Sequence, residues 1–181
     1  MADFVHVSAY ANLPLACRGV VAEERHGLAI ATVMARRGQS AALAAAVREQ
    51  FDIALPQGPR CGHSDALTFL GTGPGRWLAI HSAPQPRFAD GFSQQLEGLA
   101  SVVDQSGAFG VLRLSGPRVL EVLAKGVAID LDATSFPAGR VAVTQIAHLG
   151  ATLWKVDEAP SFDIAVARSY ASSFAHWLQS S

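Results

Sequence analysis

Residues 102–126, VVDQSGAFGVLRLSGPRVLEVLAKG, decide the fold, because a strand-like run, a tight corner and a helical pattern follow one another there. The apolar run at 109–114 predicts a strand, and residues 117–125 predict a helix that a proline opens at its first turn. Between them lies the corner Ser115-Gly116-Pro117. Many proteins hold a phosphate at a glycine corner of this kind, so the corner indicates either a nucleotide site or a structural turn.

Pro117 favours the structural turn. A phosphate-binding corner offers several free backbone N–H groups at a helix N-terminus, usually with a lysine close behind. Pro117 has no backbone N–H group, and no lysine follows it closely. A serine cap, a glycine turn and a proline in the first helical turn are ordinary structural devices. We therefore predict that this corner only turns the chain.

The two halves of the chain show one order of elements. In the first half we expect a strand at 28–33, a helix at 40–51 with Ser40 as its N-cap, strands at 66–70 and 77–81, and a helix at 88–99. In the second half we expect a strand at 109–114, a helix at 117–125, a hairpin of 141–149 and 152–156 about Gly150, a strand at 162–167 and a helix at 170–178.

Matching residues in the last helix of each half indicate an internal duplication. Phe174 follows Phe92 at the spacing at which Leu178 follows Leu96. Within each helix the phenylalanine and the leucine lie at i and i+4, on one helical face. Two copies of one packing unit need the same side chains on that face.

The sequence therefore predicts an α+β fold of duplicated half-domains with antiparallel sheets and packed helices. We expect an irregular N-terminal arm at residues 1–25, a first α+β half at 26–100 and a second at 101–181, packed as one compact unit. The arm is apolar but follows no regular period. It therefore packs either on a partner subunit or back across its own sheet.

The composition argues against some partners and favours others. Half of the residues are hydrophobic, 16% are charged, and the formal net charge is −1. Lysine and arginine are scattered singly, so the chain lacks the basic stripe that binds nucleic acid and the polybasic segment that binds anionic membranes. The high hydrophobic fraction favours a subunit with part of its surface covered by a partner protein.

The cysteines and the first residues predict a cytoplasmic protein. Met1-Ala2-Asp3 carries an acid where a secretory signal carries bases, and no run approaches the roughly 20 apolar residues of a membrane span. Cys17 and Cys61 lie far apart in the sequence and lack C-x-x-C spacing. We expect both to be reduced thiols.

Metal and nucleophile chemistry are disfavoured by spacing. The possible zinc ligands Cys17, His26, Cys61 and His63 do not follow the usual ligand spacings. No G-x-S-x-G elbow or recognisable cysteine signature is present, and the six histidines are spread singly. The glycine cluster at 71–75 precedes a strand, which predicts a hairpin loop.

The remaining candidates are also typical of structure. Asp104 and Ser106 form a possible polar site, but this pair is more typical of a turn. Trp154 and Trp177 are expected to serve packing in the core or an interface. We therefore assign no catalytic, cofactor-binding or metal-binding residue to this chain.

The second half of the chain contains, in order, Val103-Asp104-Gln105-Ser106, residues 111–118, the Lys125-Gly126 end of the predicted helix, Asp130-Leu131, Phe136-Pro137, and residues 167–174 with Trp177-Leu178. With these stretches, residues 100–178 resemble the gamma subunit of heterotetrameric sarcosine oxidase; before residue 100 only the general layout agrees.

The resemblance implies a fold similar to the folate-binding aminomethyltransferase, or glycine-cleavage T-protein, fold. It also implies a non-catalytic gamma subunit that works with alpha, beta and delta subunits. Such a complex demethylates sarcosine to glycine, passes the one-carbon unit to tetrahydrofolate and forms peroxide, with FAD, FMN, NAD and tetrahydrofolate bound by the partners. Two alternatives stay open: a stand-alone folate-binding or aminomethyltransferase-like protein, and the equivalent subunit of another N-methyl amino acid dehydrogenase. Shared fold alone implies no activity.

Overall fold

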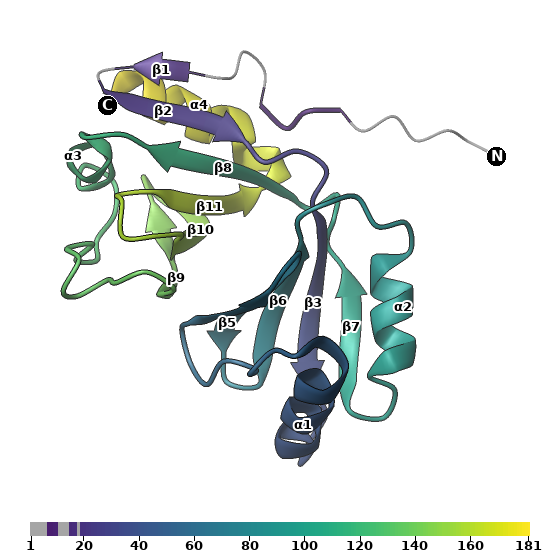
Figure 1. The fold of residues 1–181 in the computed structure, drawn as a ribbon. Coiled ribbons are helices and arrows are strands. Elements are labelled where there is room, and N and C mark those ends of the chain that lie inside the picture. Colours follow the sequence, from purple (N-terminus) through teal and green to yellow (C-terminus); the bar gives the residue numbers. More distant parts are fainter. Residues whose placement is uncertain (1–6, 11–14, 18) are drawn as a thin grey trace. The chain divides into compact units, whose positions relative to one another are not determined.

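A computed structural model describes residues 7–10, 15–17 and 19–181 of the chain (Figure 1). Two compact units share these residues. Unit 1 comprises residues 1–27, 108–138 and 143–181, as far as they are described, and unit 2 comprises residues 28–107 and 139–142. Both units combine antiparallel strands with helices, so the α+β fold class predicted from the sequence is confirmed.

Unit 2 is a five-stranded sheet with two helices (Figure 1). In spatial order its strands are β4 (Cys61–Ser64), β5 (Leu67–Gly73), β6 (Arg76–His81), β3 (Ala29–Ala35) and β7 (Ala100–Asp104). Its helices are α1 (Ser40–Phe51) and α2 (Phe88–Gln95). Alternate strand residues such as Val33, Phe69 and Trp77 form one buried cluster with Leu43 of α1 and Phe92 of α2. Side chains that recur every second residue along the strands thus pack against side chains from one face of each helix.

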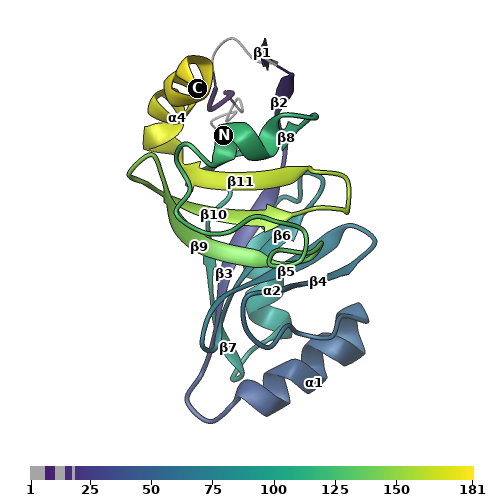
Figure 2. The same ribbon diagram turned by 90° about the vertical axis from the view of Figure 1, so that its left-hand side faces the viewer.

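Unit 1 is built on a six-stranded sheet. In spatial order its strands are β1 (Leu15–Cys17), β2 (Val20–Glu24), β8 (Phe109–Ser115), β11 (Phe162–Ala167), β10 (Leu149–Lys155) and β9 (Val141–Ile146). Figure 2 shows β11, β10 and β9 side by side. The helical elements are α3 (Val119–Leu123), the 3₁₀ turn Arg168–Tyr170 and α4 (Ala171–Ser180). Helix α4 packs on β11, and Phe174 and Leu178 of this helix are buried.

The two units share one topology. The order β4-β5-β6-β3-β7 in unit 2 corresponds to β9-β10-β11-β8-β2 in unit 1, and β1 is an added edge strand. Helices α1 and α3 follow the first central strand of each unit, and α2 and α4 follow the third strand of each meander. Along the chain, one repeat runs from β2 to α2 and the next from β7 to α4. Each repeat therefore gives its first strand to the sheet of the other unit.

This strand exchange explains how the structural units differ from the predicted segments. Strand β7 pairs with β3 in unit 2, whereas the prediction placed residues 101–181 in the second half. Residues 20–24, predicted as part of an irregular arm, form β2, which pairs with β8. Long-range pairing decides both assignments, and local periodicity carries no information about it. Packing as one compact unit stays a prediction.

The starts of two helices differ from the prediction. Ser40 is the first helical residue of α1 and not its N-cap, because Gly38 turns the chain with φ of 78° and the Gln39 carbonyl accepts the first helical hydrogen bond, from Leu43, at 2.8 Å. Helix α3 begins at Val119, later than predicted, because the Arg118 carbonyl accepts its first bond. Neither helix has a side-chain cap.

The hairpin between β9 and β10 turns earlier than predicted. Ala147 and His148 both adopt the left-handed conformation, with φ of 48° and 69°, and Gly150 lies inside β10. Two successive left-handed residues twist a hairpin in the sense of its strands. Asn-Gly normally fills such a turn, so Ala-His gave no sequence signal.

Candidate functional site

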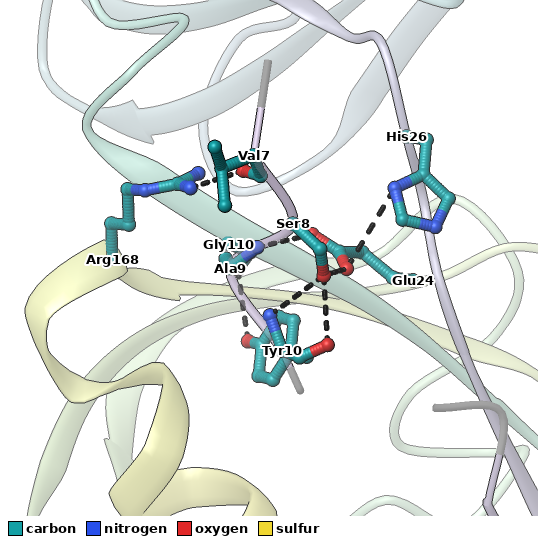
Figure 3. A network of polar contacts seen from close by, with 8 residues as sticks. All are labelled: Val7, Ser8, Ala9, Tyr10, Glu24, His26, Gly110 and Arg168. Atoms are coloured by element: carbon teal, nitrogen blue, oxygen red, sulfur yellow. Dashed lines mark hydrogen bonds and ion pairs between the residues drawn. The ribbon is translucent and has the colours of Figure 1, made fainter. Parts of the chain in front are cut away.

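A polar network ties residues 7–10 to the sheet of unit 1 (Figure 3). Glu24, at the end of β2, is its centre: the carboxylate accepts hydrogen bonds from the Ser8 hydroxyl and, at 2.8 Å, from the Ala9 backbone N–H. Only 6% of the Glu24 side chain is exposed. This carboxylate is therefore committed to holding the segment, which we call the N-terminal strap (residues 7–10).

Tyr10 anchors the strap on β8. Its ring is buried, and its hydroxyl donates a hydrogen bond of 3.2 Å to the Gly110 carbonyl (Figure 3). Burial, together with the negative charge of Glu24, raises the pKa of the Tyr10 phenol well above its ordinary value. A Cβ atom on Gly110 would lie 2.8 Å from the Tyr10 ring, so only glycine lets the strap lie this close to the strand.

Two further contacts complete the network in Figure 3. Arg168 donates a hydrogen bond to the Val7 carbonyl, and His26 Nδ1 lies 3.7 Å from Glu24 Oε2. Of the two predicted alternatives, residues 7–10 follow the one in which the arm lies across its own sheet. Phe4, Val5 and Leu13, which are apolar residues of the predicted arm, lie outside the described residues.

A partly buried ion pair joins β8 and β11. Arg113 Nε and Nη2 donate to the two carboxylate oxygens of Asp163 at 2.7 and 2.8 Å, and Arg25 lies 3.6 Å from the same carboxylate. The Asp163 side chain is 7% exposed. Its hydrogen bond raises the pKa of the Arg113 guanidinium. Since both oxygens are engaged, Asp163 acts as a cross-strand link and offers no free base.

Unit 2 carries an open hollow of about 440 Å³ between the β4–β5 turn and α2. Phe51, Phe88 and Phe92 line it, with stacked or tilted rings whose centroids lie 4.7 to 4.9 Å apart. Asp65 is its acidic lining residue, and Asp90 lines an adjoining hollow. A small-molecule site buries most of its ligand and presents a few convergent polar groups, but this hollow is open and both acids are exposed. These hollows therefore do not fit the folate that the fold implies, and we derive no step through it.

The corner Ser115-Gly116-Pro117 turns the chain, as predicted. Gly116 has φ of 115°, and a Cβ atom there would lie 2.4 Å from the Gly19 carbonyl oxygen. The Arg118 backbone N–H points at the same oxygen, at 3.4 Å. This corner is packed against the backbone of Gly19, whose carbonyl oxygen already accepts from the Arg118 N–H group.

Two other predicted turns are confirmed. Strands β5 and β6 form a hairpin across the glycine cluster, with an irregularity between Gly71 and Gly73. Asp104 Oδ1 accepts hydrogen bonds from the Ser106 backbone N–H and hydroxyl at 2.9 and 2.8 Å. The Ser106 hydroxyl in turn accepts from Ile30 at 3.0 Å, so this pair closes the ends of β7 and β3.

The four possible zinc ligands belong to separate units. Cys17 and His26 are part of unit 1, whereas Cys61 and His63 lie on β4 of unit 2. Across residues 7–10, 15–17 and 19–181, no group of three His, Cys, Asp or Glu side chains could hold a metal ion. Among the helices that the structure describes, none is long and apolar enough to cross a membrane.

The two tryptophans serve packing. Trp154 is buried in β10, and Trp177 is half-buried and stacks on Phe174 with ring centroids 5.7 Å apart. A Cβ atom on Gly126 would lie 2.6 Å from the Trp177 ring. Gly126, in the turn after α3, therefore makes room for this ring. Phe174 of α4 and Phe92 of α2 are both buried.

The fold is similar to that of an aminomethyltransferase. A solved aminomethyltransferase T of the glycine cleavage system from Bartonella henselae superposes with a TM-score of 0.63 and 13% identity, over 88% of this chain and 45% of that one. This likeness extends to the fold alone. The heterotetrameric sarcosine oxidase from Corynebacterium sp. U-96, solved with pyrrole 2-carboxylate, contains a chain with a TM-score of 0.78 and 26% identity, over 95% of this chain and 86% of that one.

Sequence comparison identifies the family. The model of the "Sarcosine oxidase, gamma subunit family" matches residues 37–181, and this chain belongs to that family. Sarcosine oxidase subunit gamma is 30% identical over 136 residues in Corynebacterium sp. strain P-1 and 32% identical over 145 residues in an Arthrobacter species. These matches cover 74% and 76% of this chain, and 66% of each relative's length.

Proposed function

We propose that this chain is a non-catalytic gamma subunit of a sarcosine oxidase complex. Membership of the gamma subunit family, matched over residues 37–181, is the observation that carries the proposal. The structural likeness to a chain of a heterotetrameric sarcosine oxidase supports the same role.

The use of the shielded carboxylates favours a structural role. Glu24 holds the N-terminal strap, and Asp163 links β8 to β11. Asp104, which is exposed, closes a turn. A catalytic acid or base needs a titratable side chain that faces a bound substrate, and these three are already engaged within the chain.

The complex that we propose oxidises sarcosine to glycine, transfers the one-carbon unit to tetrahydrofolate and forms peroxide. In this assignment FAD, FMN, NAD and tetrahydrofolate are bound by alpha, beta and delta subunits. This chain contributes surface and scaffold to their assembly. The same scaffold suits a complex that acts on another N-methyl amino acid.

Purification of the tagged chain from its native host, with identification of every protein that accompanies it, tests this proposal. We expect larger flavin-containing chains to accompany it and sarcosine-dependent peroxide formation by the complex. The chain purified alone is expected to form no peroxide from sarcosine. Oxidation of sarcosine by the lone chain would overturn the non-catalytic assignment.

The aminomethyltransferase-like fold calls for a second measurement, of stand-alone folate binding. Equilibrium titration of the lone chain with tetrahydrofolate is expected to give no saturable binding, because the described hollows present only exposed acids. Tight saturable binding would favour a folate-binding protein over a subunit.

A further inference from the structure

Two arginines face each other in unit 2. Arg60 and Arg140 form an isolated antiparallel bridge. The residue after each arginine donates a backbone hydrogen bond to the residue before the other, at 2.7 and 2.9 Å. In this pattern the two Cα atoms approach to about 4.5 Å and the side chains leave the same face of the ladder. Like charges placed directly opposite destabilise a strand pair unless an anion neutralises them.

Neither charge is neutralised within the described part of the chain. The ion pairs found there involve other arginines, histidine or lysine, and none includes Arg60 or Arg140. The Nε atom of Arg140 is shielded from solvent, yet among the described residues it has no hydrogen-bond acceptor. A shielded N–H group without an acceptor is a cost that folded proteins rarely keep. The pair is therefore incomplete in the lone chain.

The backbone around Arg60 is fixed in place. Its N–H donates to the Gly58 carbonyl and its own carbonyl accepts from Gly71, each at 2.9 Å. A Cβ atom on Gly71 would lie 1.9 Å from the Gly58 oxygen, so the loop and strand β5 approach as closely as backbones can. The Trp77 indole N–H also holds this loop, through a 2.9 Å bond to the Pro56 carbonyl. These contacts hold the backbone of Arg60, one of the two charged residues, in a fixed position.

We propose that the Arg60–Arg140 pair receives a carboxylate side chain of a partner subunit. This inference rests on the proposed function, because it needs an assembly to supply the acid. A carboxylate accepts two parallel hydrogen bonds from one guanidinium group, and it neutralises both like charges at once. Among the described residues the Nε atom of Arg140 has no hydrogen-bond acceptor, so the acid supplies the acceptor that this N–H group lacks.

A partner side chain fits this pair better than a free anion. The hollow beside α2 and the hollow that adjoins it are lined by other residues, so neither of these two hollows encloses a small ion at the pair. An ion on an open surface keeps its water and binds weakly. A side chain delivered by a docking partner is desolvated by the contacts around it, which strengthens its bond to the arginines.

The test uses the complete complex, reconstituted from its purified chains, and measures the dissociation constant of the tagged gamma chain for its partners. The variants are Arg60→Gln, Arg140→Gln and the double variant. Arg37→Gln is the matched control, since Arg37 is an exposed arginine of unit 2 and forms no ion pair with a described residue. Circular dichroism checks that each variant is folded, and Arg60 is exposed, so its replacement leaves the core untouched.

We expect each single variant to weaken assembly roughly 5- to 10-fold, the double variant by more than about 30-fold, and Arg37→Gln by less than about twofold. The salt dependence of assembly should also be shallower in the double variant. If the wild-type chain assembles and the double variant has the same dissociation constant, this inference is overturned and the proposed function stays in place. Failure of the wild-type chain to bind any oxidase subunit would overturn both.

Discussion

At the residue scale, glycines at close backbone or side-chain approaches shape this chain more than reactive side chains do. Gly110 lets the Tyr10 ring lie on β8, Gly116 meets the Gly19 carbonyl, and Gly126 receives the Trp177 ring. Each position has a neighbour within 3.0 Å of an added Cβ atom. Glycine-to-alanine substitutions at these positions therefore test the contacts seen in the structure.

Gly110→Ala should release the N-terminal strap. The new methyl group would lie 2.8 Å from the Tyr10 ring and 2.9 Å from Ala9 Cβ, so the strap must move. We expect a loss of about 1–3 kcal/mol in the free energy of unfolding, and faster hydrogen exchange at residues 7–10. Gly107→Ala is the control, because an added Cβ there has no neighbour within 4 Å. Equal effects of the two substitutions would contradict the strap contact.

Tyr10 should make stability fall at alkaline pH. Because its pKa in the folded state is raised above the ordinary value of 10.0, the folded protein holds the phenol proton more tightly than the unfolded chain does. The stabilisation is complete below pH 10 and is lost as pH rises above it. Tyr10→Phe should remove this dependence and cost about 1 kcal/mol at neutral pH, through the lost bond to Gly110. Urea unfolding at several pH values measures both effects, and parallel alkaline curves for the two proteins would contradict the assignment.

At the scale of elements, strongly patterned strands and helices were predictable and weakly patterned ones were not. Strands β8 and β11 begin where their apolar runs predicted, and α1 has the predicted bounds. Strands β2, β4 and β7 were missed, because their short, mixed sequences become strands only through pairing with β8, β5 and β3. The Arg60–Arg140 pair was missed for the same reason, since an isolated bridge joins residues far apart in the chain.

The β9–β10 hairpin offers a stabilising substitution. Ala147 and His148 both hold the left-handed conformation, which costs free energy in residues with a Cβ atom. Replacing them with Asn-Gly should raise the free energy of unfolding by about 0.5–1 kcal/mol, measured by thermal or urea unfolding. Asn-Gly at exposed positions 133–134 is a control, because neither residue there has a positive φ. A loss of stability from the hairpin variant would contradict the turn assignment.

At the scale of the whole molecule, the duplication and the compact units follow different boundaries. The sequence repeat is visible in the order of elements and in the matched pair Phe92 and Phe174. The exchange of β2 and β7 between the two sheets is not visible there, because it is a property of pairing between distant segments. The strap network had no sequence signature.

Strand exchange predicts that the two predicted halves do not fold separately. Residues 26–100 lack most of β7, and residues 101–181 lack β2, so in each fragment one edge of a central strand, β3 or β8, has lost its neighbour. We expect little cooperative unfolding by circular dichroism for either fragment alone. Mixing residues 1–100, which include β2, with residues 101–181, which include most of β7, should increase the structured fraction. Cooperative unfolding of residues 101–181 alone would contradict the exchange.

Native mass spectrometry of the tagged chain, purified gently from its host, tests the subunit assignment most directly. We predict a dominant heteromeric species in which this chain is bound to other oxidase chains, with flavin retained by those chains after this chain dissociates. Detection of this chain only as a monomer or a homo-oligomer, or of flavin bound to it alone, would contradict the assignment.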